Sequence, residues 1–501
     1  MVAEFDVLAL TVQKMFRAMS FNSISRAARL TVQSAILGGL TLFSLGCGQG
    51  TPAEFKLRST TEDLITDAEK AVKKTLAEGF GSPYELVAWE RFPVVYGGVK
   101  GTVESIAENK SLVVKLDSEA HPIKVDSPIL FISGSAASEK PTAKVASFDA
   151  EKNQLTVTGV APAAGDRFIA GFGEQFQMGR QVYMRNCMHC HGVTGDGAGP
   201  TGEFLNPRPR DYRNGQFKFT STKPGEKACR DDLHRIVKYG IPGTYMPSFL
   251  LLGENETEAV IEYIRWLAIR GEFEKRMVTE LSGDYSEKSI ADSVNKAKEA
   301  GEKAPSLSKA IKAAAEEFGK YSKEDYPAAV EETASFLADA WTRADEPDTV
   351  IVPSVQRVAD SPESRERGRL LYMSDKTKCY TCHGMTGRGD GSATEDRWPK
   401  PGSTEKYDKP GLHDEWGFPL KPRNLTLGQY RGGRRPVDIF RRMYAGIKGT
   451  PMPAFGGTAL KDEEIWDLVN FVMSLPYAPQ QSTPAPGPGG HVAKVDEKPA
   501  H

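Results

Sequence analysis

The chain has 501 residues and carries 64 lysines and arginines against 66 aspartates and glutamates. This length is greater than one compact core usually contains, so about three domains are expected. The nearly balanced charge gives no overall attraction to nucleic acid, and we expect no nucleic-acid partner.

The N-terminal region is typical of an export signal. Arg26 and Arg29 precede an apolar run, 30–46, that is short and interrupted for a membrane span, which leaves an uncleaved anchor helix as the alternative. The run ends in Ser44-Leu45-Gly46-Cys47, which resembles a bacterial lipoprotein signal, although Ser44 stands where an aliphatic residue is common. The resemblance implies a signal peptide over 1–46 and a lipid on Cys47. It also implies attachment to the membrane on the periplasmic side of a bacterial cell envelope.

The segment 47–91 is predicted to be a polar tether followed by one amphipathic helix over 61–78, ended by Gly79 and Gly81. Short β-rich runs then fill 92–172. Two stretches within them repeat: Val103-x-Ser105-Ile106 with a following apolar run, and Val145-x-Ser147-Phe148 with another. We expect two hairpins in a small all-β barrel or sandwich that serves packing or docking.

Two pentapeptides carry the clearest chemistry, Cys187-Met188-His189-Cys190-His191 and Cys379-Tyr380-Thr381-Cys382-His383. Two cysteines three apart can add their thiols to the vinyl groups of a haem while the adjacent histidine ligates the iron. A zinc site is the alternative, but it rarely requires a histidine directly after the second cysteine. Four of the six cysteines lie in these motifs. The sequence therefore predicts two covalently bound haems.

Similar helical patterns surround both motifs. Gly179 and Tyr183 precede the first motif and a helix over 256–269 follows it, while Gly368 and Tyr372 precede the second and a helix over 462–475 follows it. A glycine four residues before a tyrosine allows two helices to cross closely with the ring packed at the crossing. We expect two equivalent domains, 174–271 and 351–477.

A later loop also recurs: the stretch Gly240 to Phe249 matches Gly446 to Phe455 almost position by position. With the cysteine motifs, these loops make both domains resemble class I cytochrome c domains, joined as a dihaem cytochrome c. The resemblance implies a mainly α fold with an additional small all-β module. It also implies that Met246 and Met452 are the second axial ligands of the two irons, opposite His191 and His383. A thioether opposite imidazole favours reduced iron.

Two further segments are expected beside each haem. A carbonyl of the glycine-rich turns 195–200 and 387–391 is predicted to accept the Nδ1–H of the iron-binding histidine. Arg208 and Arg423 each follow a proline, and either is a candidate to pair with a haem propionate or a solvated surface residue.

Three other residues are weighed as ligands. Cys229, on an iron, would indicate a thiosulfate-oxidising enzyme, but a free cysteine is more often a small buried hydrophobe. His234 and His413 are predicted to be surface or capping residues that could in principle replace a methionine.

The remaining segments are assigned by composition. Residues 277–350, with 16 acidic and 9 basic side chains, are predicted to be a helical insertion. Residues 421–448 hold eight basic side chains against one acidic, which suits either an encounter patch for an acidic redox partner or a solvated face. The Pro/Gly-rich tail 478–501 is predicted to be disordered.

Together these features favour an electron carrier rather than an enzyme, because six-coordinate irons leave no place for substrate. The expected partners are a quinol-oxidising complex or another donor, and a terminal oxidase or reductase. The alternatives are a catalytic dihaem enzyme, a peroxidase or thiosulfate dehydrogenase, and an electron-transfer subunit of a fixed respiratory complex.

Overall fold

The computed structural model describes residues 54–107, 110–117, 123–138, 141–400, 403–414 and 417–478. The predicted export signal, Cys47 and the tail after residue 478 lie outside the described residues. Among the described helices, none combines the length and apolarity required to cross a bilayer.

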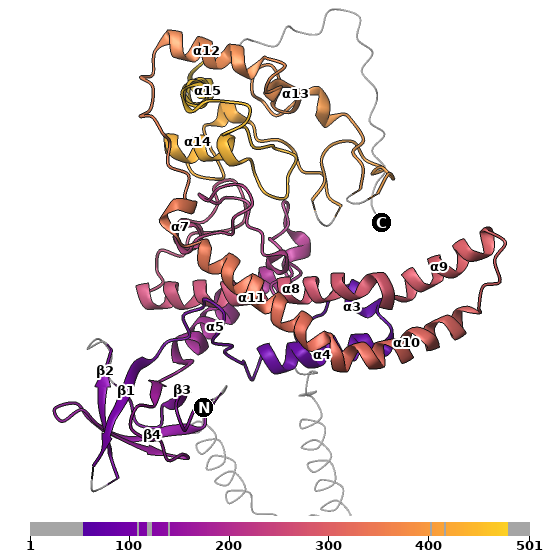
Figure 1. Ribbon diagram of the computed structural model, residues 1–501. Coiled ribbons are helices and arrows are strands. Elements are labelled where there is room, and N and C mark those ends of the chain that lie inside the picture. The colour runs from indigo at the N-terminus through magenta and orange to yellow at the C-terminus, as the bar shows by residue number, and fades with distance from the viewer. Residues whose placement is uncertain are drawn as a thin grey trace, which may run out of the picture. The chain divides into compact units, whose positions relative to one another are not determined.

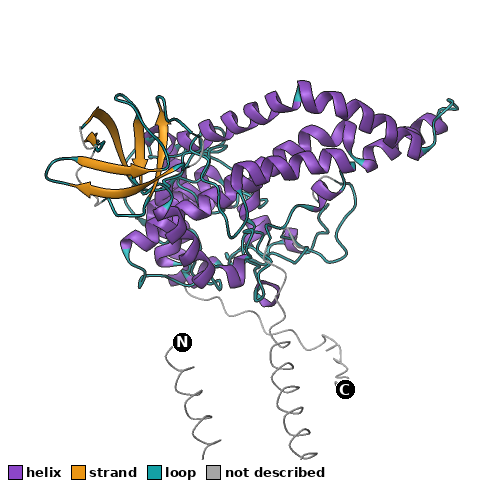
Figure 2. Cartoon of the chain, turned by 90° about the horizontal axis from the view of Figure 1, so that it is seen from below, coloured by secondary structure: helices purple, strands orange, loops and turns teal. Residues whose placement is uncertain are grey.

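The predicted β module is a closed antiparallel barrel (Figure 2). Its strands follow the order β1-β2-β5-β4-β3-β6. Their bounds are β1 Val99–Ile106, β2 Leu112–Leu116, β3 Pro128–Ser133, β4 Ala143–Asp149, β5 Gln154–Thr158 and β6 Arg167–Ala170. The predicted repeat is confirmed, since the hairpins β1–β2 and β4–β5 carry a register shift at the same place, after Val103 and after Val145.

The first motif-bearing domain is built on two crossing helices. Gly179 of α5 (Glu174–Asn186) lies so close to α8 (Glu254–Tyr285) that an added Cβ would be 2.1 Å from the carbonyl oxygen of Ala259. The ring of Tyr183 lies 5.2 Å from that of Tyr263 at the same crossing. The other elements here are α6 (Met188–His191), η1 (Gly202–Phe204), η2 (Tyr212–Asn214) and α7 (Arg230–Tyr239).

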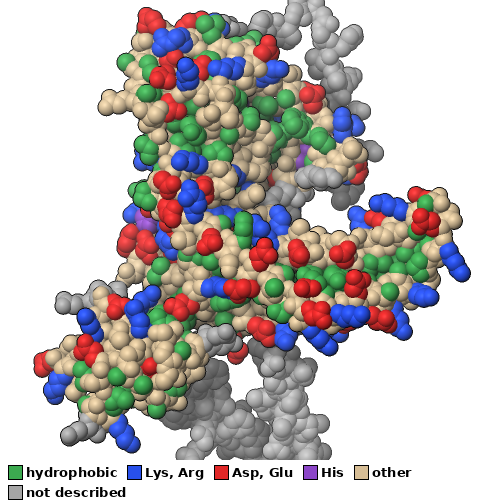
Figure 3. Space-filling model, in the orientation of Figure 1, with side chains coloured by type: hydrophobic (Ala, Val, Ile, Leu, Met, Phe, Trp, Pro, Cys, Tyr) green, Lys and Arg blue, Asp and Glu red, His purple; other side chains and the backbone are tan. Residues whose placement is uncertain are grey.

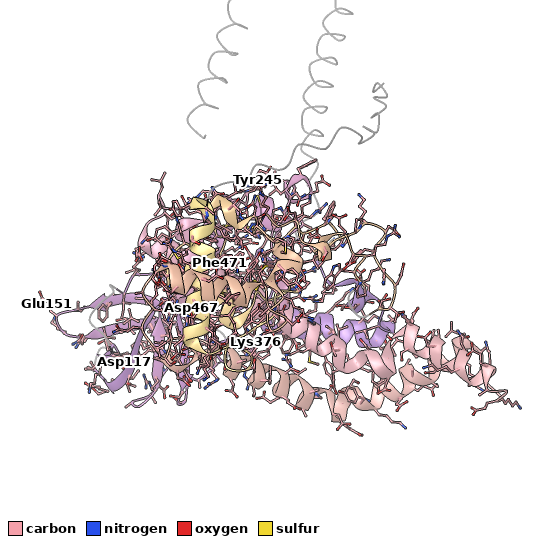
Figure 4. The ribbon with its side chains drawn as sticks, turned by 90° about the horizontal axis from the view of Figure 1, so that it is seen from above. Asp117, Glu151, Tyr245, Lys376, Asp467 and Phe471 are labelled. Atoms are coloured by element: carbon pink, nitrogen blue, oxygen red, sulfur yellow. The ribbon has the colours of Figure 1, made fainter. Side chains whose placement is uncertain are left out.

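The second motif-bearing domain repeats this crossing with α12 (Pro362–Tyr372) and α15 (Asp462–Ser474). An added Cβ on Gly368 would lie 2.1 Å from the carbonyl oxygen of Asp467, and the Tyr372 ring lies 5.3 Å from that of Phe471. Figure 4 labels Asp467 and Phe471 along α15. The remaining elements are α13 (Cys379–His383), η4 (Ser392–Thr394), η5 (Leu425–Leu427), α14 (Pro436–Ala445) and η6 (Leu475–Tyr477).

The region between the two domains is helical, and its first helix is α8 itself. The expectation that this helix ends near 269 is wrong, because α8 continues to Tyr285. Gly271 provides close packing rather than a stop, since an added Cβ would lie 2.4 Å from the Cα of Arg213. The elements that follow are α9 (Glu287–Glu299), α10 (Leu307–Glu324), α11 (Tyr326–Arg343) and η3 (Pro347–Thr349), and Figure 1 shows α9 and α10 running side by side.

The N-terminal helices belong to the same helical core. The chain forms α3 (Ser59–Glu62) and α4 (Thr66–Phe80), and α4 passes through Gly79 before Gly81 ends it with a φ of +70°. Leu76 of α4, Phe273 of α8 and Leu337 of α11 are all buried in one cluster. The first domain and the helical region are therefore packed as one body rather than tethered.

The basic segment 421–448 is partly an internal surface. Arg442 donates to the carbonyl oxygens of Lys218 (3.2 Å) and Thr220, and Lys448 donates to that of Glu226, all in the first domain. Asp438 accepts from Arg235 of the first domain at 2.9 Å. For Arg442 and Lys448 the expectation of an encounter patch or a solvated face is thus wrong, because they bind backbone carbonyls between the two domains. Figure 3 shows acidic and basic side chains interspersed over the visible face.

Candidate haem sites

Each cysteine motif forms a short helical turn held by the preceding helix. Tyr183 donates its hydroxyl to the carbonyl of Gly192 at 2.8 Å, and Tyr372 donates to that of Gly384 at 2.7 Å. Both glycines have left-handed φ values, +76° and +77°, which glycine adopts without steric cost. The tyrosine of each Gly/Tyr pair therefore fixes the point at which the chain leaves its motif.

The two histidines predicted to bind iron are oriented by backbone carbonyls outside the glycine-rich turns. His191 Nδ1 lies 3.2 Å from the carbonyl oxygen of Arg210, and His383 Nδ1 lies 3.1 Å from that of Arg423. The expectation that the turn itself supplies the acceptor is therefore wrong. Gly197 instead packs against the carbonyl of Pro209, where an added Cβ would be only 2.6 Å away, and so supports the segment that carries the acceptor.

These hydrogen bonds leave Nε2 of each ring as the nitrogen that can ligate iron. Burial lowers the pKa of His191 to about 4, and burial also lowers the pKa of His383. Both imidazoles are consequently neutral near pH 7, the form that binds metal. The Tyr212 ring stacks on His191 with 4.7 Å between centroids. The sequence pattern did not identify Tyr212 as part of the site. Its position could have indicated it, because Tyr212 lies two residues after Arg210, as Leu425 lies two residues after Arg423 in the second domain.

The two methionine loops are closed by the same hydrogen bonds. Met246 accepts from the Ile241 N–H at 3.1 Å, and its own N–H donates to the Thr244 hydroxyl at 3.1 Å. In the second domain Met452 accepts from the Ile447 N–H at 3.2 Å and donates to the Thr450 hydroxyl at 3.3 Å. Each methionine backbone is thereby fixed without help from a ligand.

In the first domain the predicted ligands lie around one cavity of about 420 Å³. Cys187, Cys190, His191 and Met246 all line it. Its apolar wall includes Tyr212, Phe217, Leu233, Val237, Phe249, Val260 and Ile264. Two thiols, a neutral imidazole and a thioether in an apolar cavity are the donor set and surroundings that suit haem c.

The two predicted propionate partners are not equivalent residues. The carbonyl contacts match Arg210, not Arg208, with Arg423. Arg208 lines the cavity, and its guanidinium carbon lies 4.7 Å from the ring centre of Phe418 in the second domain. The Arg423 guanidinium donates to Gln429, at 2.9 Å to the carbonyl and 2.8 Å to the side-chain oxygen. The recurring Pro-Arg pair was matched in the wrong register because the first domain contains two such pairs in succession.

The alternative ligands lie outside the lining of this cavity. Cys229 is buried with its sulfur 3.6 Å from the Ser221 hydroxyl, and burial raises the pKa of its thiol to about 11. His234 Nε2 lies 3.0 Å from a carboxylate oxygen of Glu254. His413 stacks on Tyr407 with 3.9 Å between ring centres.

Each of these small helical domains presents two thiols, a histidine oriented by a carbonyl, and a methionine loop held by hydrogen bonds. This combination is typical of domains that bind haem covalently. Residues 176–268 and 366–476 match the family model described as cytochrome c. Both domains belong to the cytochrome c family, which implies covalently bound haem c and electron transfer.

The search of solved structures gave a chain of the reducing HAO-like protein complex of Kuenenia stuttgartiensis. It is 25% identical, with a TM-score of 0.39, and the match covers 60% of this chain and 96% of that chain. No curated protein matches the sequence.

Proposed function

We propose that the protein holds two haems c and carries single electrons between redox proteins. The observation that supports this most directly is that the same hydrogen bonds hold the predicted ligands in both sites. In each, a carbonyl orients the histidine and two hydrogen bonds pin the methionine loop. With His191 and Met246 on one iron and His383 and Met452 on the other, no coordination position is left for substrate, and electrons pass without bond making.

The ligand set also indicates the range of reduction potential in which the carrier works. A methionine opposite histidine raises the reduction potential of a haem. Such potentials suit an acceptor of electrons from a quinol-oxidising complex and a donor to a terminal oxidase or reductase. The apolar run before Cys47 supports a lipid anchor that holds the protein on the periplasmic side of the membrane.

Low-temperature electron paramagnetic resonance of the oxidised full-length protein tests this proposal. We expect two low-spin signals of the His/Met type and no high-spin iron. A high-spin or thiolate-ligated signal, or ready uptake of carbon monoxide by either reduced haem, would instead indicate a catalytic dihaem enzyme.

A second candidate is an electron-transfer subunit of a fixed complex. The β-barrel (residues 99–170) and the helices α9 and α10 contribute no residue to the described haem cavity, which favours a role in docking. Purification after gentle detergent extraction distinguishes the two: a carrier is recovered alone, and a subunit is recovered with stoichiometric partners.

A further inference from the structure

The two haem sites approach each other across the boundary between their domains. An added Cβ on Gly243, in the first methionine loop, would lie 2.6 Å from Nη2 of Arg423 in the second domain. Reciprocally, an added Cβ on Gly449, in the second methionine loop, would lie 2.8 Å from Nη2 of Arg210 in the first. Each arginine thus orients its own domain's histidine through its carbonyl and reaches the other domain's methionine loop through its guanidinium.

The cavity of the first site is completed by the second domain. Two residues of the second domain, Asp414 and Arg431, stand among those that line it. The charged side chains on the lining are mostly basic: Arg185, Arg208, Arg210, Lys218 and Arg431, with Asp414 as the acidic one. The cavity lining therefore carries an excess of positive charge, which suits a ligand that bears anionic groups.

Arg431, which the second domain contributes to this set, has an unmet bonding requirement. It is half-buried, and within the described part of the chain its buried Nε has no hydrogen-bond partner. A buried donor without a partner destabilises the folded state, and more so when the group is charged. Burial and the nearby charge of Arg423 both lower the pKa of Arg431. Like charges held together in this way are stabilised when an anion binds beside them.

We propose that Arg431, from the second domain, binds a propionate of the haem in the first domain. Arg431 is then a positioning residue for that haem, and the second domain completes the first site. The proposal rests on the proposed function only in requiring haem c in the first domain. A guanidinium suits the ligand because it presents a fork of donors to a carboxylate.

The expected consequence is on the potential of the first haem. A positive charge that neutralises a propionate disfavours the ferric state, so its removal makes reduction less favourable. We expect Arg431→Gln to lower the equilibrium constant for reduction of the first haem about tenfold, the size expected of a partly buried charge near the iron. The second haem should be unaffected.

The experiment is spectroelectrochemical titration of the holoprotein in a Met452→His background, where replacement of the thioether moves the second haem to a much lower potential and separates the two waves. Arg434→Gln is the matched control, because Arg434 lies three residues after Arg431 and carries the same charge. Its side chain is exposed and donates a hydrogen bond to the Tyr477 hydroxyl. Arg431→Lys is the companion variant. It retains the charge but not the fork, and its shift should be smaller than that of Arg431→Gln.

Three outcomes would overturn the proposal: an unchanged first wave in both Arg431 variants, a shift confined to the second wave, or an equal shift in Arg434→Gln. The second outcome would mean that Arg431 serves the haem of its own domain. Failure of the proposed function is a separate result, recognised by the absence of a low-spin His/Met signal from the first haem before any Arg431 variant is made.

Discussion

The crossing of α5 and α8 gives a sharp prediction about stability. Gly179 faces the backbone of α8, and an added Cβ would lie 2.1 Å from the carbonyl oxygen of Ala259 and 3.1 Å from the Cβ of Tyr263. Ordinary contact begins near 3.4 Å, and the obstructing atom is backbone that no rotamer change can remove. The helices would have to separate by about 1 Å, which disturbs a close-packed core.

We therefore expect Gly179→Ala to destabilise the holoprotein. Overpacking of this kind costs about 3 kcal/mol, and the better helix propensity of alanine offsets about 1 kcal/mol of it. The net loss of unfolding free energy is about 2 kcal/mol. The measurement is guanidinium unfolding followed by far-UV circular dichroism and by haem absorbance, which reports on the site that Tyr183 supports.

Gly319→Ala is the matched control for this prediction. Gly319 lies inside α10, is exposed, and an added Cβ would have no neighbour within 4 Å. The same substitution should here stabilise the protein by about 0.5–1 kcal/mol, because alanine loses less conformational freedom than glycine in a helix. The close-crossing argument is refuted if Gly179→Ala unfolds at the same denaturant concentration as the unmodified protein, or if the two variants change stability equally.

Three further predictions concern the ligands, the anchor and the domain boundary. Met246→Ala should leave an open iron position in the first domain, giving a high-spin signal and cyanide binding at half of the total haem; full low-spin character would show that another residue is the ligand. Cys47→Ser should move the protein from the membrane fraction to the soluble fraction without changing its haem spectrum, and retention in the membrane would favour an uncleaved anchor helix. Burial lowers the pKa of Lys448 to about 8 from 10.5, so the folded state loses this proton before the unfolded state does. Stability should therefore rise with pH between about 8 and 10.5, and Lys448→Met should remove that part of the rise in denaturation curves measured at pH 7 and pH 9.5.

The sequence was most informative where one local pattern occurred twice. The Gly/Tyr pairs predicted both helix crossings, because a spacing of four residues on a helix places the glycine and the tyrosine on one face. The repeat in the β-rich region predicted two similar hairpins in a small barrel or sandwich, and the structure adds that both hairpins have a register shift at the equivalent place, after Val103 and after Val145. In each case the signal depends on residues close in sequence, so the backbone period alone converts it into geometry.

The sequence was least informative where a contact joins distant segments. Nothing local distinguishes a helix that ends at Gly271 from one in which Gly271 receives another backbone, and only the packing of Arg213 against it decides the matter. The acceptor of His191 is likewise a carbonyl 19 positions away, and every residue has a carbonyl. A side-chain pattern therefore cannot identify it.

The basic segment 421–448 shows why charge alone misleads. Its side chains have the composition of a solvated face, yet Arg442 and Lys448 bind carbonyls of the first domain, while the carbonyl and the guanidinium of Arg423 contact opposite domains. Because one residue fixes His383 and also borders the loop that carries Met246, a displacement of either site changes the surroundings of the other. The contacts of Arg423 therefore link the geometry of the two sites, which the composition of the segment alone does not reveal.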